Sequence, residues 1–193
     1  MSDMKLGNPA VVGLAGFGMT TFVLQCHNLG WCGLAPVIWI GMVFGGTAQL
    51  IAGFLEFKTG NNFGFCAFTG YGAFWISLCL MLIFGTNAGL KTAYPVLAFS
   101  DKDLGFFLVA WTIFTFLLFI ASMKHHGTLA LIFLTLLVGF IGLDIEKLTG
   151  NAAAGTFAAY DLLLCAFSAL YLMAVAVFAE AGITLPVGAA WIK

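Results

Sequence analysis

Long runs of apolar residues, separated by short polar breaks, make up almost the whole chain. The apolar stretches cover approximately residues 10–26, 35–55, 63–85, 104–122, 127–143 and 153–179. They are too long for strands and do not alternate between apolar and polar residues, so the pattern predicts helices rather than a barrel. A helix needs about 20 mostly apolar residues to cross a bilayer. The pattern therefore predicts an all-α membrane protein with six transmembrane helices in a single domain, residues 1–193.

The polar breaks hold nearly all of the charge and most of the turn-forming residues. They cover residues 27–30, 56–62, 85–103, 124–126 and 144–151. An even number of spans places both ends of the chain on one side of the membrane. The lysines then divide four to three in favour of that side. This small excess favours a cytoplasmic N-terminus.

Composition supports the membrane assignment and excludes several classes of function. Hydrophobic residues make up 62% of the chain and charged residues only 8%, whereas a soluble domain carries about a quarter charged residues. The net charge of −1 gives no indication of nucleic-acid binding. The sequence contains no nucleophile elbow, P-loop or HExxH motif. We therefore expect no catalytic residue, metal ion or cofactor, and we expect the protein not to be an enzyme.

The start of the first stretch carries candidate substrate-binding residues. Asn8 is a good helix N-cap and Pro9 suits the first helical position, so a helix with free N–H groups should begin here. Such an end attracts anions, although a simple helix start explains the pair equally well. Phe17 and Thr20 share a helix face, with Thr21 beside them, and this surface suits a small molecule with a methyl end and an oxygen end. Alternatively, the hydroxyls bond to carbonyls of their own helix.

Ionisable residues within apolar stretches are the default functional candidates in a membrane protein. Glu56, Asp161 and Glu180 are the candidates for carrying a proton. Glu56 and Glu180 should lie at the membrane interface. Asp161 is either an intramembrane carboxyl or precedes a helix that starts late, and the late start is preferred. The pair His125-His126 is either a pH sensor or, more commonly for such a pair, part of a solvated loop.

Several motifs together resemble those of a known family. Asn8-Pro9-Ala10, followed by the run from Gly13 to Thr21, resembles the signature of the acetate uptake transporter family, whose bacterial members are called succinate–acetate permeases. The likeness extends along essentially the whole chain, through His27-Asn28, Gly45-Gly46, Gln49, Leu55-Glu56, Gly60-Asn61, residues 67–75 and Leu185-Pro186.

The resemblance implies a plasma (inner) membrane protein with six helices per subunit, a cytoplasmic N-terminus and a homo-hexameric assembly with one pathway in each subunit. It implies uptake of acetate, with succinate as a second substrate in some members. Three family positions form a narrow apolar constriction, and Asn8 matches a residue at one mouth. The pathway positions implied here are Asn8, Phe17, Thr20, Thr21, Gln49, Tyr71, Phe74 and Leu136, with Phe17, Tyr71 and Leu136 at the constriction.

The chain departs from the family pattern at two places. Val11 replaces the second proline of the usual opening, and Ala176 stands near a position where relatives can carry an acid. If proton coupling in the family uses that acid, proton coupling by this chain is in question.

Elementary electrostatics limits the form in which a carboxylic acid can cross the membrane. A simple carboxylic acid titrates like a Glu side chain, so at about pH 7 only one molecule in several hundred is neutral. An anion in an apolar gap is unfavourable by several kcal/mol, and the chain has no Arg to clamp it. We therefore expect weak binding and movement of the acid together with a proton, although the sequence does not separate symport from an anion channel. The alternatives are a channel for a small neutral solute such as urea, and a membrane scaffold or enzyme that moves no solute.

Overall fold

The computed structural model describes residues 7–193, and every long element in it is an α-helix. Six helical spans are long and apolar enough to cross a membrane, which confirms the six-helix prediction. The helices are α1 (Ala10–Asn28), α2 (Ala35–Ile40), α3 (Gln49–Thr59), α4 (Asn62–Thr86), α5 (Ala88–Ala93), α6 (Asp101–Ser122), α7 (Gly127–Thr149) and α8 (Ala152–Glu180). A π-helical segment, η1 (Gly41–Ala48), joins α2 and α3 into one span, and a short 3₁₀ helix, η2 (Pro95–Leu97), follows α5.

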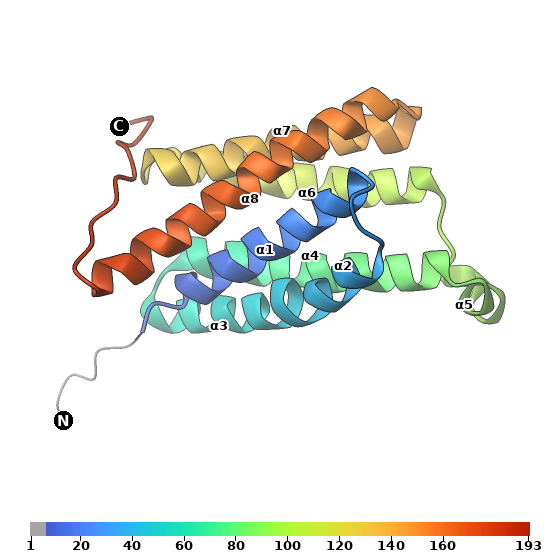
Figure 1. The fold of residues 1–193 in the computed structure, drawn as a ribbon, viewed down its shortest axis with the longest axis horizontal. Coiled ribbons are helices and arrows are strands. Elements are labelled where there is room, and N and C mark those ends of the chain that lie inside the picture. The colour runs from blue at the N-terminus through green and yellow to red at the C-terminus, as the bar shows by residue number, and fades with distance from the viewer. Residues whose placement is uncertain (1–6) are drawn as a thin grey trace.

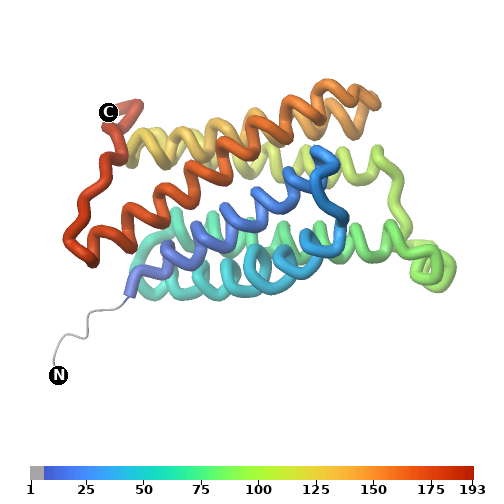
Figure 2. The backbone as a smooth tube through the Cα atoms, in the orientation of Figure 1, coloured from blue at the N-terminus to red at the C-terminus, as the bar shows by residue number. Residues whose placement is uncertain are grey.

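The long helices run along a common axis, as Figures 1 and 2 show. Helix α1 packs against α8 on one side and against η1 and α3 on the other. Helix α3 lies beside α4, while α6, α7 and α8 pack in chain order. The short helix α5 projects at one end of the molecule, and the C-terminus lies at the opposite end (Figure 1). That opposite end also holds the N-terminal ends of α1, α4 and α7.

Helix ends follow local capping chemistry, and this moves several predicted boundaries. Helix α7 continues to Thr149, past the predicted end near residue 143, and stops where Gly150 has φ +74°. Helix α3 similarly continues to Thr59 and stops at Gly60, with φ +80°. Glycine adopts this left-handed conformation without a steric penalty and is the usual helix terminator. Both helices therefore extend into segments whose charges suggested polar breaks.

The GxxxG pair Gly41 and Gly45 serves two different neighbours of the second span. A Cβ at Gly41 would clash with Sγ of Cys79 on α4, and one at Gly45 would lie 2.5 Å from Oγ1 of Thr20 on α1. Both glycines lie within the π-helical segment η1. π-helical turns are rare and occur mostly as local bulges. This span therefore packs closely against two helices and also changes its helical register just before Gln49.

The segment after α8 packs across the end of the molecule where the C-terminus lies. The N–H groups of Trp191 and Ile192 donate to the carbonyl of Met123, at 3.0 and 3.2 Å. The N–H of Thr128 donates to the carbonyl of Val187 at 2.8 Å. These bonds fix the loop between α6 and α7 from outside the helices.

Candidate functional site

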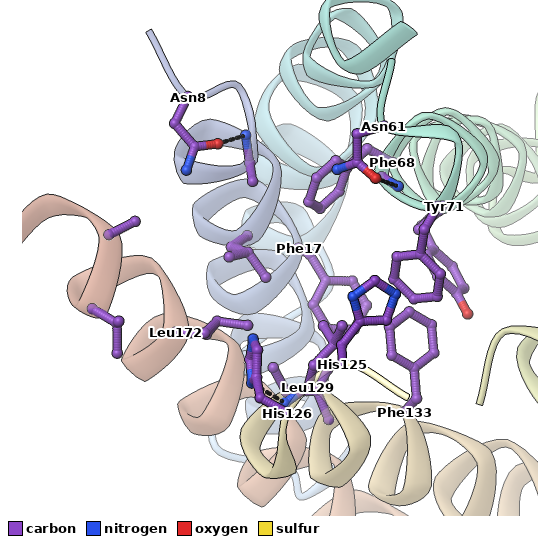
Figure 3. Close-up of a pocket in the computed structure, with 18 of the residues that line it drawn as sticks. Asn8, Phe17, Asn61, Phe68, Tyr71, His125, His126, Leu129, Phe133 and Leu172 are labelled. Atoms are coloured by element: carbon purple, nitrogen blue, oxygen red, sulfur yellow. Dashed lines mark hydrogen bonds between the residues drawn. The ribbon is translucent and has the colours of Figure 1, made fainter. Parts of the chain in front are cut away.

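A cavity of about 290 Å³ lies between α1, α4, α7 and α8 at the end of the molecule where α1, α4 and α7 begin. Its mouth is lined by polar residues that come just before these helices or at their starts: Asn8, Asn61, His125 and His126. Deeper residues are almost all apolar, and Figure 3 shows their rings turned toward the same space. The cavity therefore has a polar entrance and an apolar interior.

Three side chains bond N–H groups at helix starts around this mouth. Oδ1 of Asn8 accepts the N–H of Ala10 at 3.0 Å, and Oδ1 of Asn61 accepts the N–H of Gly64 at 3.0 Å. Nδ1 of His126 accepts the N–H of Leu129 at 3.2 Å. Since a helix N-terminus carries a partial positive charge, the three ends together favour an anion at the entrance.

The inner end of the cavity holds the three residues implied for the constriction. The rings of Phe17 and Tyr71 lie 5.7 Å apart between centroids, and Leu136 lines the same cavity from α7. All three side chains are at most 5% exposed. Tyr71 pairs its hydroxyl with Thr115 Oγ1 on α6 at 2.9 Å. Its ring, rather than its hydroxyl, therefore contacts the cavity, and the role of the three residues as a gate stays a prediction.

Gln49 is the most unusual polar residue of the cavity. It lines the cavity from the start of α3 and is 0% exposed. Neither Nε2 nor Oε1 of its amide has a hydrogen-bond partner within the part of the chain that the structure describes. A buried amide without partners is unfavourable by about 1–3 kcal/mol, and both polar atoms of Gln49 are available to a ligand that enters the cavity.

Three further predicted pathway residues do not line this cavity. Thr20 and Thr21 are buried, and their hydroxyls have no partner among residues 7–193, so the bonds to carbonyls of their own helix, which were the alternative explanation for these hydroxyls, are not formed. Thr20 instead packs against Gly45. Phe74 lies one turn beyond Tyr71 and packs edge-on against Trp111 at 5.2 Å. These residues are part of the helix packing around the cavity.

One expectation about acidic residues is wrong, and it concerns Asp161. Glu56 lies in the last turn of α3 and is 2% exposed, because this turn packs against the start of α4, where Asn61 Nδ2 donates to Glu56 Oε2 at 2.8 Å. Its place at the membrane interface stays a prediction. Asp161 does not precede its helix: α8 begins at Ala152, capped by Asn151, and Asp161 is partly buried within it. Glu180 is exposed at the end of α8. None of the three acids is among the cavity-lining residues.

The sequence reading missed one buried acid. Asp144 is 9% exposed, and its Oδ2 accepts a hydrogen bond from Thr112 on α6 at 2.6 Å. It was placed in a polar break because charge alone marked the end of the fifth stretch. The glycine terminator at Gly150 was the available signal that the helix continues past Asp144.

Comparisons with known proteins agree with this architecture. The family model described as the GPR1/FUN34/yaaH family matches residues 1–188. This chain belongs to the GPR1/FUN34/yaaH family. The resemblance to acetate uptake transporters, first seen in the motif beginning at Asn8, is thereby confirmed.

Relatives within the GPR1/FUN34/yaaH family carry transport names. The succinate-acetate/proton symporter SatP of Escherichia coli (strain K12) is 43% identical over 173 residues, which cover 89% of each chain. Acetate permease A of Emericella nidulans is 35% identical over 182 residues, covering 86% of this chain and 60% of the relative. The solved structure of the bacterial acetate channel SatP aligns with a TM-score of 0.88 and 41% identity, covering 95% of this chain and 100% of that chain. The GPR1/FUN34/yaaH fold is thus matched over nearly the full length.

Proposed function

We propose that the protein moves acetate across a bilayer, with succinate as a second substrate. The observation that carries the proposal is the cavity: three helix N-termini and polar side chains at its mouth, then an apolar interior that ends at Phe17, Tyr71 and Leu136. A carboxylate suits the entrance and a methyl group suits the interior. The names of the SatP relatives and of acetate permease A support the same substrate class.

The acid moves together with a proton, because a bare carboxylate in the apolar interior would be unfavourable by several kcal/mol. The side chains of Glu56, Asp161 and Glu180 remain the candidates for carrying that proton, and Glu56 contacts the cavity-lining Asn61. The position near which relatives can carry an acid, Ala176, lines the cavity here. The proton therefore travels on the substrate itself or by way of residues just outside the cavity.

The remaining features of the proposal follow from the family. The chain assembles as a homo-hexamer in the plasma (inner) membrane, each subunit with its own pathway and a cytoplasmic N-terminus, and it catalyses no reaction. The cavity entrance then lies on the cytoplasmic side, where α1 begins. No metal or other cofactor takes part in transport.

Labelled acetate uptake into liposomes that contain the purified protein tests the function. At about pH 7, where few acid molecules are neutral, uptake is expected to exceed that of empty liposomes and to be competed by succinate but not by urea. Gradients of pH and voltage imposed separately distinguish proton-coupled movement from passage of the anion. Uptake equal to the lipid background would contradict the proposal, and competition by urea would favour a neutral-solute channel.

Shortening Leu136 tests the constriction. Leu136→Ala removes buried carbon atoms from α7 at the inner end of the cavity, so lactate uptake should rise about threefold or more relative to acetate as steric exclusion relaxes. A Leu→Ala change in a core costs about 2–5 kcal/mol of stability. Leu143→Ala is the matched control, because this buried leucine of α7 is not among the cavity-lining residues. An unchanged lactate-to-acetate ratio in folded Leu136→Ala protein would place the gate elsewhere.

A further inference from the structure

The basic side chains at the cavity mouth are two histidines. The described residues that line the cavity include no Asp, Glu, Lys or Arg, but they include His125 and His126. Both belong to the short loop between α6 and α7, and Figure 3 shows their rings at the entrance, beside Leu129 and opposite Asn8 and Asn61. An acid entering the cavity therefore passes the two imidazoles before it reaches any other basic group.

Hydrogen bonding gives the two rings different states. Nδ1 of His126 accepts the N–H of Leu129 at 3.2 Å, so the proton of the neutral ring lies on Nε2, which remains a donor. Burial, and secondarily the neighbouring His125, lower the pKa of His126 below its usual value. His126 is therefore a neutral N–H donor at neutral pH, because protonating it would remove the cap of α7.

The ring of His125 is accessible at the mouth. Its side chain is exposed, and its ring packs against Phe63 at 5.1 Å between centroids. A histidine ring carries at least one N–H donor, which can bond a carboxylate oxygen. Among residues 7–193, the charged side chains at this end of the molecule are Lys124 in the same loop, Lys193 in the C-terminal segment, Glu56 and Lys58 on α3, and Glu180 at the end of α8.

The neighbouring charges leave the entrance open to an anion. Lys124 directs its ammonium to the carbonyl of Lys193, and Glu56 lies behind Asn61, to which it is hydrogen-bonded. Gln49 is an independent sign that the cavity receives a polar ligand, because its fully buried amide lines the same space and has no partner among the described residues.

We propose that His125 and His126 together bind the carboxylate of the transported acid at the mouth of the cavity, before the aromatic constriction. One carboxylate oxygen accepts the Nε2–H of His126, and the other faces the ring of His125. This inference rests on the proposed function and names two residues that select the substrate at entry.

Three variants separate binding from helix capping. His125→Phe keeps a ring against Phe63 but removes its N–H groups. His126→Asn keeps an acceptor for the N–H of Leu129, since Asn is a good N-cap, and His126→Asp keeps the cap but adds a negative charge. Lys124→Gln is the matched control, because it removes a charge from the same loop without changing the cavity lining.

Initial rates of labelled acetate uptake into proteoliposomes, after subtraction of empty liposomes, give KM and kcat. At about pH 6, KM should rise about three- to tenfold in His125→Phe and most in His126→Asp, with kcat changed less than twofold, as expected for the loss of a charge-assisted contact. KM in Lys124→Gln should match that of the unmodified protein.

The outcomes distinguish this inference from the function beneath it. No uptake by the unmodified protein would overturn the proposed function and the inference with it. Normal uptake, with KM unchanged in all three histidine variants, would overturn the histidine site and leave acetate transport in place. A KM that rises equally in Lys124→Gln would also overturn the site, because the effect would then come from the general charge of the loop.

Discussion

Replacing Gln49 with Leu is expected to reduce acetate uptake at least about tenfold without reducing stability. The amide of Gln49 is fully buried in the cavity and has no partner among the described residues. An amide that hydrogen-bonds only to the passing substrate contributes about 1.5–3 kcal/mol when the bonded group is charged. This energy corresponds to a change of about tenfold or more in uptake. Leu has a similar size and leaves no polar atom unpaired, so the folded state should be as stable as before or more so.

Uptake and thermal unfolding should be measured on the same preparation. Gln25→Leu is the matched control: Gln25 is 1% exposed, but it lies near the far end of α1, outside the set of cavity-lining residues. This control should transport normally. Uptake by Gln49→Leu at the unmodified rate would show that the buried amide plays no part in transport.

Replacing Gly53 with Ala is expected to destabilise the protein by about 3 kcal/mol, at the upper end of what overpacking usually costs. A Cβ at Gly53 on α3 would lie 2.5 Å from the backbone nitrogen of Thr69 on α4. The same two helices approach closely at a second point, because a Cβ at Gly72 on α4 would lie 2.7 Å from the backbone nitrogen of Leu50 on α3. Backbone atoms cannot rotate away as a side chain can, so the two helices would have to separate.

The midpoint of thermal unfolding in detergent measures this effect. Gly33→Ala is the control, since no atom lies within 4 Å of a Cβ built there and its φ is not positive. We expect Gly53→Ala to unfold well below the unmodified protein and Gly33→Ala to match it. Equal midpoints for the two variants would show that α3 and α4 can move apart without loss of stability.

The sequence predicted the number of membrane-spanning helices because each apolar stretch satisfies its own backbone hydrogen bonds, which is a local property. The ends of α3 and α7 were misplaced because the charged residues Glu56 and Asp144 read as polar breaks. Both are buried by contacts with other helices, Glu56 through Asn61 and Asp144 through Thr112. Such partners come from tertiary packing, which no single stretch of sequence records.

The candidate site was predictable in part. Asn8, Phe17, Gln49, Tyr71 and Leu136 all line the cavity. Of these, Gln49, Tyr71 and Leu136 came from family likeness, whereas Asn8 and Phe17 also stood out through helix-start chemistry and the pattern of one helix face. The position of His125 and His126 at the entrance was not predictable, because two adjacent histidines in a loop do not indicate which way their side chains point. Of the three side chains that bond N–H groups at helix starts, the sequence pointed only to Asn8, and His126 is not among the usual capping residues.

The contact of the C-terminal segment with the loop between α6 and α7 sets an order on the maturation of the protein. Met123 receives its hydrogen bonds from Trp191 and Ile192, which are synthesised after every transmembrane helix. The helices around the cavity can therefore insert and pack while this loop still lacks its outer support. The hydrogen bonds that support the loop of His125 and His126 can therefore form only after residues 187–192 have been synthesised and have folded back onto it.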